Sequence, residues 1–266
     1  MGKLEEPRAH KHQLHVLIIG MKEVVHALNS FQVRASVDSP LLLRSLSWDT
    51  KLPFLKRRLN LRRYYITLYR ANVQVGAGIQ IPPNSSRLLK RWGVDLEKYC
   101  VNPIGFFLRG YKTGSVLSEV NLVPDGVSKY GSPYWHAHRA DFHRALLERA
   151  FQLGVQVHID SRVIDVDFNY PPKVTVARGD VYTAELVIGC DGIKSVCREA
   201  LQGRVDPPRA TGDMAYRIVV PAEAMKRHEE LRELLEDPAI NFWIGPDGHA
   251  VCYPLRDGSL YNIVLL

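Results

Sequence analysis

Several absences limit the class of protein to which this chain of 266 residues can belong. It contains no apolar run near the roughly 20 residues that a membrane-spanning helix needs, and its first residues lack an apolar signal core. The four cysteines form no Cys-x-x-Cys pair, which is typical of reduced thiols inside a cell. Internal repeats and low-complexity tracts are absent as well. Together these features predict a cytoplasmic globular protein without a transmembrane segment.

Acidic side chains are missing from one stretch of the sequence, residues 51–70. This window contains seven basic residues: Lys51, Lys56, Arg57, Arg58, Arg62, Arg63 and Arg70. The formal net charge of the whole chain is +7, so the residues outside the window sum to zero. A confined basic cluster is one way to bind nucleic acid or an anionic surface. A basic interaction module is therefore one hypothesis for the function.

The remaining composition is ordinary for a globular protein, with 46% hydrophobic and 24% charged residues. Alternating apolar patterns between residues 155 and 188 predict strands and a hairpin. Residues 222–236 form a charged helical pattern, and strand patterns follow it near residues 241–244 and 249–254. This mixture of strands and amphipathic helices predicts an α/β fold.

The most informative motif follows a short apolar strand at residues 185–188. Residues 189–198 read Gly-Cys-Asp-Gly-Ile-Lys-Ser-Val-Cys-Arg. A carboxylate, exposed backbone amides and a guanidinium around one helix start can meet phosphate and ribose groups. Asp191 and Gly192 are therefore candidate cofactor-binding residues. An ordinary Asp-Gly turn with Ser195 as the helix cap would explain the same residues.

A second segment, residues 75–93, combines glycines with a short helical pattern. Gly76 and Gly78 would let the backbone approach a ligand closely, which makes them candidate cofactor-binding residues. Asn84 or Ser85 is expected to cap a helix that stops at Gly93.

A third segment begins at His138-Arg139 and continues as an amphipathic helical pattern. Asp141 is expected to cap this helix, which would end at Gly154. His136 and His138 alternate on a strand and could share a metal ion, but no third ligand is evident and Arg139 would repel a cation. We therefore expect no metal site.

These three segments, in this order, resemble the flavin-binding segments of the FAD-dependent aromatic hydroxylases, the salicylate hydroxylase and para-hydroxybenzoate hydroxylase group. The family fingerprint Gly-Ala-Asp-Gly-x-x-Ser-x-x-Arg differs from this chain only at Cys190. In the family the arginine at the position of Arg139 lies against the flavin. The resemblance implies a Rossmann-like FAD-binding domain of the glutathione-reductase type over residues 1–204. A partial sheet-based substrate domain would follow over residues 205–266.

The resemblance also implies an activity and its reactants. FAD would be the cofactor, NADH or NADPH the co-substrate, and O₂ and a phenolic or polyketide-like small molecule the other reactants; a nucleic-acid partner is not expected. Tyr216 and Arg217 occupy the position where related enzymes carry a catalytic arginine, so both are candidate catalytic residues. A guanidinium there could favour a phenolate or hold a carboxylate. An arginine that extends along a sheet face would give the same sequence pattern.

The chain departs from the family at its dinucleotide motif. An apolar strand at residues 14–19 ends at Gly20, a candidate cofactor-binding residue, but the pattern Gly-x-Gly-x-x-Gly does not follow. The next strand pattern, residues 65–69, ends in Arg70, which has no acceptor for ribose hydroxyls. Residues 21–64 are therefore interpreted as a replacement segment, with a selected basic patch as the alternative.

A further flavin motif of the family, of the Gly-Asp-Ala-Ala-His type, is not found before Leu266. Relative to the family, the sequence thus lacks three flavin contacts. We expect it to bind FAD weakly, and a truncated, non-catalytic pseudoenzyme is the alternative to an active monooxygenase.

Overall fold

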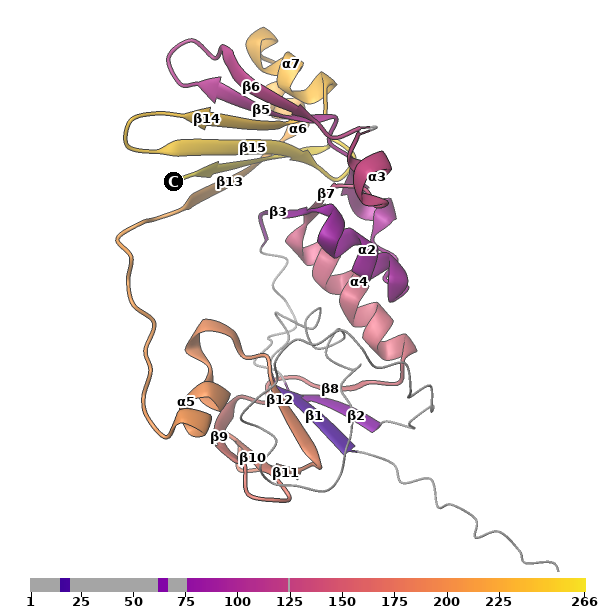
Figure 1. Ribbon diagram of the computed structural model, residues 1–266, viewed down its shortest axis with the longest axis vertical. Coiled ribbons are helices and arrows are strands. Elements are labelled where there is room, and N and C mark those ends of the chain that lie inside the picture. The colour runs from indigo at the N-terminus through magenta and orange to yellow at the C-terminus, as the bar shows by residue number, and fades with distance from the viewer. Residues whose placement is uncertain (1–14, 20–61, 67–75, 124) are drawn as a thin grey trace, which may run out of the picture. The chain divides into compact units, whose positions relative to one another are not determined.

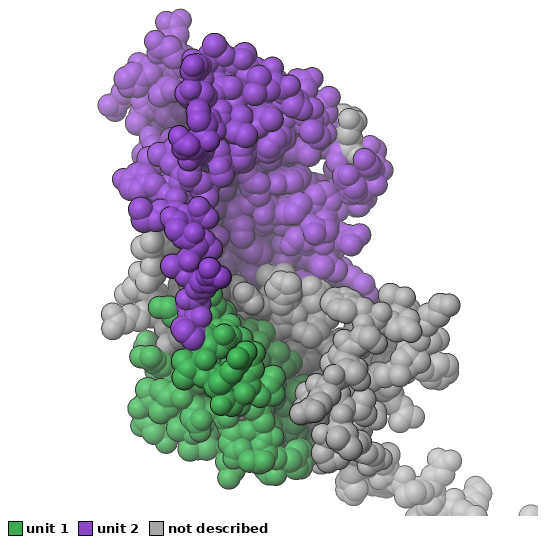
Figure 2. Space-filling model, turned by 60° about the vertical axis from the view of Figure 1, so that its left-hand side comes forward, with its two compact units in different colours: residues 1–69, 154–206 green, residues 70–153, 207–266 purple. Residues whose placement is uncertain are grey.

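The computed structural model describes residues 15–19, 62–66, 76–123 and 125–266 (Figure 1). Gly20, Arg70 and most of the basic window 51–70 lie outside these residues, so the expectations placed on them stay predictions. Contacts divide the chain into two compact units, coloured separately in Figure 2. Unit 1 comprises residues 1–69 and 154–206, and unit 2 comprises residues 70–153 and 207–266.

These units differ from the sequence-based domains 1–204 and 205–266 in one respect. The late boundary lies two residues from the expected one, between Asp206 and Pro207. Residues 70–153, however, belong with residues 207–266, because two strands between residues 105 and 121 pair into the sheet that residues 216–265 form. A compact unit reflects contacts rather than ligand binding, so the assignment of residues 1–204 to FAD binding stays a prediction.

Unit 1 is built on a four-stranded parallel sheet in the order β12-β1-β2-β8. The strands are β12 (Leu186–Gly189), β1 (His15–Ile19), β2 (Arg62–Ile66) and β8 (Gln156–His158). Val16 to Ile19 are at most 3% exposed, as expected for an unbroken apolar strand in the middle of a parallel sheet. The expected first strand is confirmed, and β2 starts three residues before the expected one.

A three-stranded antiparallel sheet completes unit 1 with β9 (Val163–Asp167), β10 (Lys173–Val176) and β11 (Val181–Thr183). The turn of the expected hairpin, between β10 and β11, contains Gly179, whose φ is 97° and whose amide donates to the Val176 carbonyl. Helix α5 (Val196–Gln202) packs Cys197 into the same core as Leu17 and Ile19 of β1. The Asp-Gly motif therefore belongs to the packed part of unit 1.

Unit 2 contains a six-stranded sheet in the order β13-β16-β15-β14-β5-β6. The strands are β13 (Tyr216–Pro221), β16 (Leu260–Leu265), β15 (His249–Leu255), β14 (Ile240–Ile244), β5 (Gly105–Gly110) and β6 (Val116–Asn121). Strand β16 is an interior strand, since β13 and β15 pair with its two edges. The parallel pairing of β5 with β14 brings the middle of the sequence into this sheet.

A smaller sheet and several helices accompany the six strands of unit 2 (Figure 1). The small sheet has the order β3-β7-β4, with β3 (Gly78–Ile81), β7 (Trp135–His138) and β4 (Cys100–Val101). The helices are α2 (Pro83–Arg91), η2 (Glu97–Tyr99), α3 (Asp125–Tyr130), α4 (Arg139–Gln152), α6 (Ala222–Met225) and α7 (Glu229–Glu236). The single helix expected over residues 222–236 is thus two. The break lets Leu231, Leu234 and Leu235 of α7 pack on the core around Tyr261.

The helix caps differ from the sequence-based expectations at two of three positions. Neither Asn84 nor Ser85 caps α2, which begins after Pro82 without a side-chain cap and has proline at its first position. Asp141 does not cap α4, because His138 does so by accepting from the Ala140 amide. Among the helices described, none is long and apolar enough to cross a bilayer.

Candidate functional site

The Asp191 carboxylate is held inside the turn that follows β12. Its Oδ1 accepts from the Ser195 hydroxyl at 2.6 Å, and its Oδ2 accepts from the Cys197 amide at 3.1 Å. Ser195 in turn caps α5, since its hydroxyl oxygen accepts from the Arg198 amide at 2.9 Å. The structure therefore contains the Asp-Gly turn with a serine cap that the sequence allowed as one interpretation. The turn is also compatible with the second interpretation, in which Asp191 contacts a cofactor, because a carboxylate can accept about four hydrogen bonds.

The backbone beside Asp191 is open to a ligand. Gly192 has a φ of 75°, and a Cβ placed on it would have no heavy atom of the described residues within 4 Å apart from its chain neighbours. The guanidinium of Arg198 does not face this space freely, since it bonds the carbonyls of Ile193 and Asp206 and pairs with the Asp206 carboxylate at 2.9 Å. An acceptor and an accessible backbone thus fit a cofactor that carries hydroxyl or phosphate groups.

In unit 2 the predicted residue Gly78 lies against two residues that the sequence did not single out, Tyr253 and Asn262. A Cβ on Gly78 would lie 2.5 Å from Cε2 and 2.6 Å from the hydroxyl of Tyr253. The Gly78 amide donates to Asn262 Oδ1 at 2.7 Å. Gly78 therefore allows β3 to pack directly on the six-stranded sheet. Gly76 is close to the start of α4, where its Cβ would lie 3.1 Å from the His138 ring.

Tyr253 is also the residue on which two predicted site residues act electrostatically. Its side chain is buried, and burial raises the pKa of its hydroxyl to about 12. The cations Arg217 and Arg139 act in the opposite direction and lower this pKa. Both guanidiniums therefore act on one buried phenol, which no sequence motif indicated. Its only signal was an aromatic residue within the strand pattern 249–254.

The two candidate catalytic residues, Tyr216 and Arg217, point to opposite faces of the six-stranded sheet. Adjacent residues in a strand alternate between faces. Arg217 lies opposite Val264 of β16, and Val264 lies opposite Val251 of β15. Val251 precedes Tyr253 by two residues, so Arg217 and Tyr253 share a face of the sheet. Tyr216 lies on the other face and is 67% exposed. The structure thus groups Arg217 with Tyr253 and does not group it with Tyr216.

His136 lies buried in the middle of this region. Its ring is fully shielded from solvent, lies tilted by 40° against Tyr253 with ring centroids 4.4 Å apart, and meets Tyr134 edge-on at 6.0 Å. The Pro254 carbonyl faces the imidazole without reaching good hydrogen-bond geometry. Burial lowers the pKa of His136 to about 3, so the imidazole is neutral at physiological pH. Among the described residues no group of three or more potential ligands could hold a metal ion.

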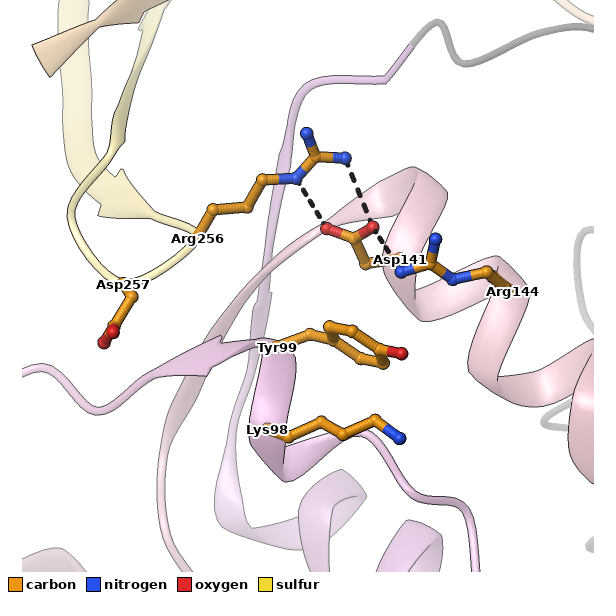
Figure 3. Close-up of a pocket in the computed structure, with 6 residues that line it drawn as sticks. All are labelled: Lys98, Tyr99, Asp141, Arg144, Arg256 and Asp257. Atoms are coloured by element: carbon orange, nitrogen blue, oxygen red, sulfur yellow. Dashed lines mark hydrogen bonds and ion pairs between the residues drawn. The ribbon is translucent and has the colours of Figure 1, made fainter.

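The start of α4 carries a charged cluster (Figure 3). The buried carboxylate of Asp141 accepts from Nε of Arg256 at 2.7 Å and from Nη2 at 3.2 Å. Arg144, one turn along α4, donates to Oδ1 of Asp141 at 3.2 Å and lies over the Tyr99 ring. A pocket of about 460 Å³ opens beside the cluster, lined by Lys98, Tyr99, Asp141, Arg144, Arg256 and Asp257. Asp141 therefore joins α4 to the turn that follows β15. It does not cap the helix, although the sequence had predicted that it would.

Comparison with known proteins identifies relatives over most of the chain. FAD-dependent monooxygenase OpS4 of Beauveria bassiana is 38% identical over 197 residues, which is 73% of this chain and 46% of that protein. 3-Amino-4-hydroxybenzoate 2-monooxygenase PtnB3 of Streptomyces platensis is 38% identical over 70% of this chain and 46% of its own length. 3-Hydroxybenzoate 6-hydroxylase of Klebsiella oxytoca is 34% identical over 72% of this chain and 47% of its own length. The chain thus spans about half the length of these curated relatives. No protein-family model matches it.

Solved structures share the fold. The crystal structure of CtdE in complex with FAD and a substrate superposes with a TM-score of 0.73 at 18% identity, over 95% of this chain and 57% of that one. The tetrameric form of 2-methyl-3-hydroxypyridine-5-carboxylic acid oxygenase superposes with a TM-score of 0.68 at 18% identity, over 95% of this chain and 58% of that one. The sequence relatives and the shared fold confirm the resemblance drawn from the three motifs. Over the part that aligns, the chain is homologous to FAD-dependent monooxygenases and aromatic hydroxylases.

Proposed function

We propose that the chain is the flavin- and substrate-binding part of a FAD-dependent monooxygenase that hydroxylates a phenolic or polyketide-like small molecule with NAD(P)H and O₂. The observation that carries this proposal is the turn after β12, where the Asp191 carboxylate stands beside the open backbone of Gly192. This arrangement offers an acceptor for hydroxyl groups and accessible amides for phosphate. The names of the relatives, which include two hydroxybenzoate hydroxylases, support an aromatic substrate.

The proposal assigns cofactor contacts to Asp191 and Gly192 in unit 1 and to Gly76, Gly78 and Arg139 in unit 2. Arg139 is an exposed cation at the first position of α4, which suits an anionic group of the cofactor. Gly76 precedes β3 and Gly78 is its first residue; neither has a side chain, so the cofactor could approach the backbone closely at both positions.

Two further assignments rest on different grounds. Gly20 is assigned from the sequence alone, since it lies outside the described residues. A cytoplasmic location is also part of the proposal, and the four free cysteines fit it.

When bound, FAD supplies the redox chemistry, in which NAD(P)H is oxidised, one atom of O₂ enters the aromatic ring and the other leaves as water. The residues of the chain bind and orient the reactants. Arg217 shares its sheet face with Val251 and Phe242, both of which are partly exposed. This face combines an apolar floor for a ring with a guanidinium for a phenolate or a carboxylate. Arg217 is thus the proposed catalytic residue. Tyr216, on the opposite face, would act only indirectly.

Flavin titration of the purified full chain tests the cofactor proposal. We expect FAD to bind and its fluorescence to change, but with an affinity below that of the relatives, because the glycine loop and the ribose acid are missing at residues 20–25 and 70. NAD(P)H oxidation with 3-hydroxybenzoate and with larger phenols, followed by product analysis, tests the reaction. A folded chain that binds no FAD at saturating concentration would overturn the proposal and leave a pseudoenzyme.

A repaired chain provides the matched control. Exchange of residues 21–61, which precede β2, for a short glycine loop and helix, together with Arg70→Glu, should tighten FAD binding because backbone amides and a ribose acceptor are restored. The repaired chain should also lose most of any affinity for polyanions, since of the seven basic residues in the window only Arg62 and Arg63 of β2 remain. A folded repaired chain that still binds no FAD contradicts the proposal. Tight, salt-dependent binding of nucleic acid by the original chain would favour the interaction module instead.

A further inference from the structure

Arg256 reaches Asp141 from a backbone conformation that arginine rarely adopts. Its φ is 47°, and Asp257 and Gly258 follow with 57° and 80° in the turn between β15 and β16. The left-handed region is sterically unfavourable for any residue other than glycine. Such a conformation persists only where surrounding contacts determine it. The two hydrogen bonds from the Arg256 guanidinium to Asp141 are contacts of this kind, and they account for an arginine at this position.

The pair holds the first turn of α4, and this turn is bonded to the segment that leads into β3. The amide of Arg139, the first residue of the helix, donates to the Ala77 carbonyl at 3.1 Å. The imidazole of His138 accepts from the Ala140 amide at 3.3 Å. Arg256 lies close enough to this imidazole to lower the pKa of His138, an effect that adds to that of burial. The hairpin, the helix start and the approach to β3 therefore form one connected structure.

A second bond joins β3 to the same hairpin independently. The Gly78 amide donates to Asn262, which lies on β16 opposite Tyr253 of β15. The attachment at Arg256 adds to this bond and to the packing of Gly78 and His136 on Tyr253. The attachments at Asn262 and at Arg256 hold the backbone from which the Arg139 side chain leaves the helix.

Arg144 contacts the same carboxylate but cannot have this role. It lies three residues from Asp141 on the same helix, so their ion pair stays within α4. Arg256 is 115 residues away from Asp141 and belongs to a different element. Removal of Arg144 would leave the attachment between helix and hairpin intact, which makes this arginine a matched control.

We propose that Asp141 and Arg256 are a positioning pair that fixes Arg139, and the adjoining Gly76–Ala77 backbone, relative to the sheet that carries Tyr253 and Arg217. The positioning itself rests only on the contacts within unit 2. Its consequence for FAD rests on the proposed function, in which Arg139 contacts the cofactor. The pair would thus connect the element that holds the cofactor with the sheet that holds the substrate.

Hydrogen exchange in the full-length chain tests the positioning without any cofactor. In Asp141→Asn and Arg256→Gln, the Arg139 amide should exchange about tenfold faster or more, as the loss of charge-assisted hydrogen bonds predicts. The Leu153 amide at the other end of α4 should keep its rate, and so should the Arg139 amide in Arg144→Gln. Unchanged exchange at Arg139 in both pair variants would overturn the proposal, as would equal acceleration along all of α4.

Two glycine variants distinguish the effect of losing the Arg256 side chain from the effect of relieving strain in the turn. Arg256→Gly and Asp257→Gly each relieve a positive φ at neighbouring positions. Only Arg256→Gly removes the bond to Asp141, so only this variant should loosen Arg139. If both variants have the same effect, the turn conformation and not the ion pair is responsible, and the proposal fails.

Chemical rescue provides a readout that a merely destabilised variant would not show. The pocket beside Asp141 is open, and the Arg256 side chain is 42% exposed, so a small cation can enter the space that Arg256→Gly vacates. Guanidinium ion at a concentration too low to denature should slow the exchange of the Arg139 amide again. Potassium chloride at the same ionic strength should not. Failure of guanidinium to slow this exchange would count against a specific carboxylate–guanidinium bond.

FAD affinity measured on the same variants tests the functional consequence. Asp141→Asn and Arg256→Gln should weaken FAD binding about tenfold or more, the scale found when a residue that orients a binding group is lost. Arg144→Gln should leave the affinity unchanged. If the unaltered chain binds no FAD while exchange responds as expected, the proposed function fails and the positioning stands. If FAD binds equally well to all variants while exchange at Arg139 responds, the cofactor consequence is wrong.

Discussion

The ring of Tyr253 occupies the space in which a side chain on residue 78 would have to lie. The nearest ring atom is 2.5 Å from the position of a Cβ on Gly78, a distance at which something must shift. The neighbouring atoms belong to the ring of Tyr253, a residue that is 4% exposed and packed against His136, so the ring has little freedom to move. Gly78 is therefore required by packing, in addition to any role beside a cofactor.

The substitution Gly78→Ala should destabilise the chain by about 1–3 kcal/mol, the range for overpacking in a well-packed core. Urea unfolding of the full chain measures this loss. Gly126→Ala is the control, because a Cβ on Gly126 meets nothing within 4 Å. The double variant Gly78→Ala/Tyr253→Leu should lose less stability than the sum of the two single losses, because the smaller side chain at residue 253 relieves the clash. Equal losses for Gly78→Ala and Gly126→Ala would contradict the packing argument.

His136 predicts an acid-dependent loss of stability. Burial lowers its pKa to about 3 in the folded chain, below its ordinary value of 6.5. Between these two values the unfolded chain binds a proton that the folded chain does not, so the free energy of unfolding falls as the pH falls. The maximal slope from this one group is about 1.4 kcal/mol per pH unit. The contribution of His136 to the free energy of unfolding should be constant above pH 6.5 and should fall progressively as the pH is lowered toward 3.

Urea unfolding of His136→Phe across the same pH range checks this assignment. Phenylalanine keeps an aromatic ring between Tyr134 and Tyr253 and removes the titrating group. The difference in unfolding free energy between the original chain and the variant should therefore change with pH below 6.5 and be constant above it. A difference that is the same at every pH would show that His136 does not titrate in this way.

Ser195→Ala should destabilise unit 1 by about 1 kcal/mol, the usual effect of losing a helix N-cap. The same hydroxyl donates to Asp191, so the substitution should also let that carboxylate move and weaken FAD binding. Ser118→Ala, at an exposed serine on β6, should change stability by less than about 0.5 kcal/mol. Circular dichroism of urea unfolding and FAD titration on both variants provide the measurements. Undiminished FAD affinity in Ser195→Ala would limit this serine to helix capping.

Arg217→Ala should weaken binding of a hydroxybenzoate about tenfold or more, as expected for the loss of a hydrogen bond to a charged group. FAD affinity should stay unchanged, because Arg217 lies in the sheet proposed for the substrate. Tyr216→Phe, one residue away on the opposite face, is the matched control and should alter neither affinity. Equilibrium dialysis with 3-hydroxybenzoate at fixed salt separates the variants. Equal binding by Arg217→Ala and the original chain would end its assignment to the substrate.

The local elements of the chain could be predicted from the sequence because their signals are local. The apolar run 14–19, the alternating pattern 163–176 and the Ser195 cap each arise from neighbouring residues, and the structure contains a strand, a sheet and a capped helix at these places. The family followed from three motifs in order, since each preserves the residue types that its backbone and ligand require. The relatives confirm this inference.

Long-range pairing decided what the sequence could not. Strand β5 pairs with β14 so that Phe242 lies opposite Leu108, 134 positions away in the sequence. This pairing depends on contacts that leave no periodic signal in either strand alone. The same is true of Asp141, which a local pattern assigned to helix capping and which a hairpin 115 residues away binds instead. Tyr253 became recognisable as a site residue only when β3 was packed against β15. Sequence by itself determined the elements and the family, because short-range sterics and motif chemistry are local. Tertiary structure alone decided which side chains meet, because burial and charge pairing depend on neighbours that the chain supplies from far away.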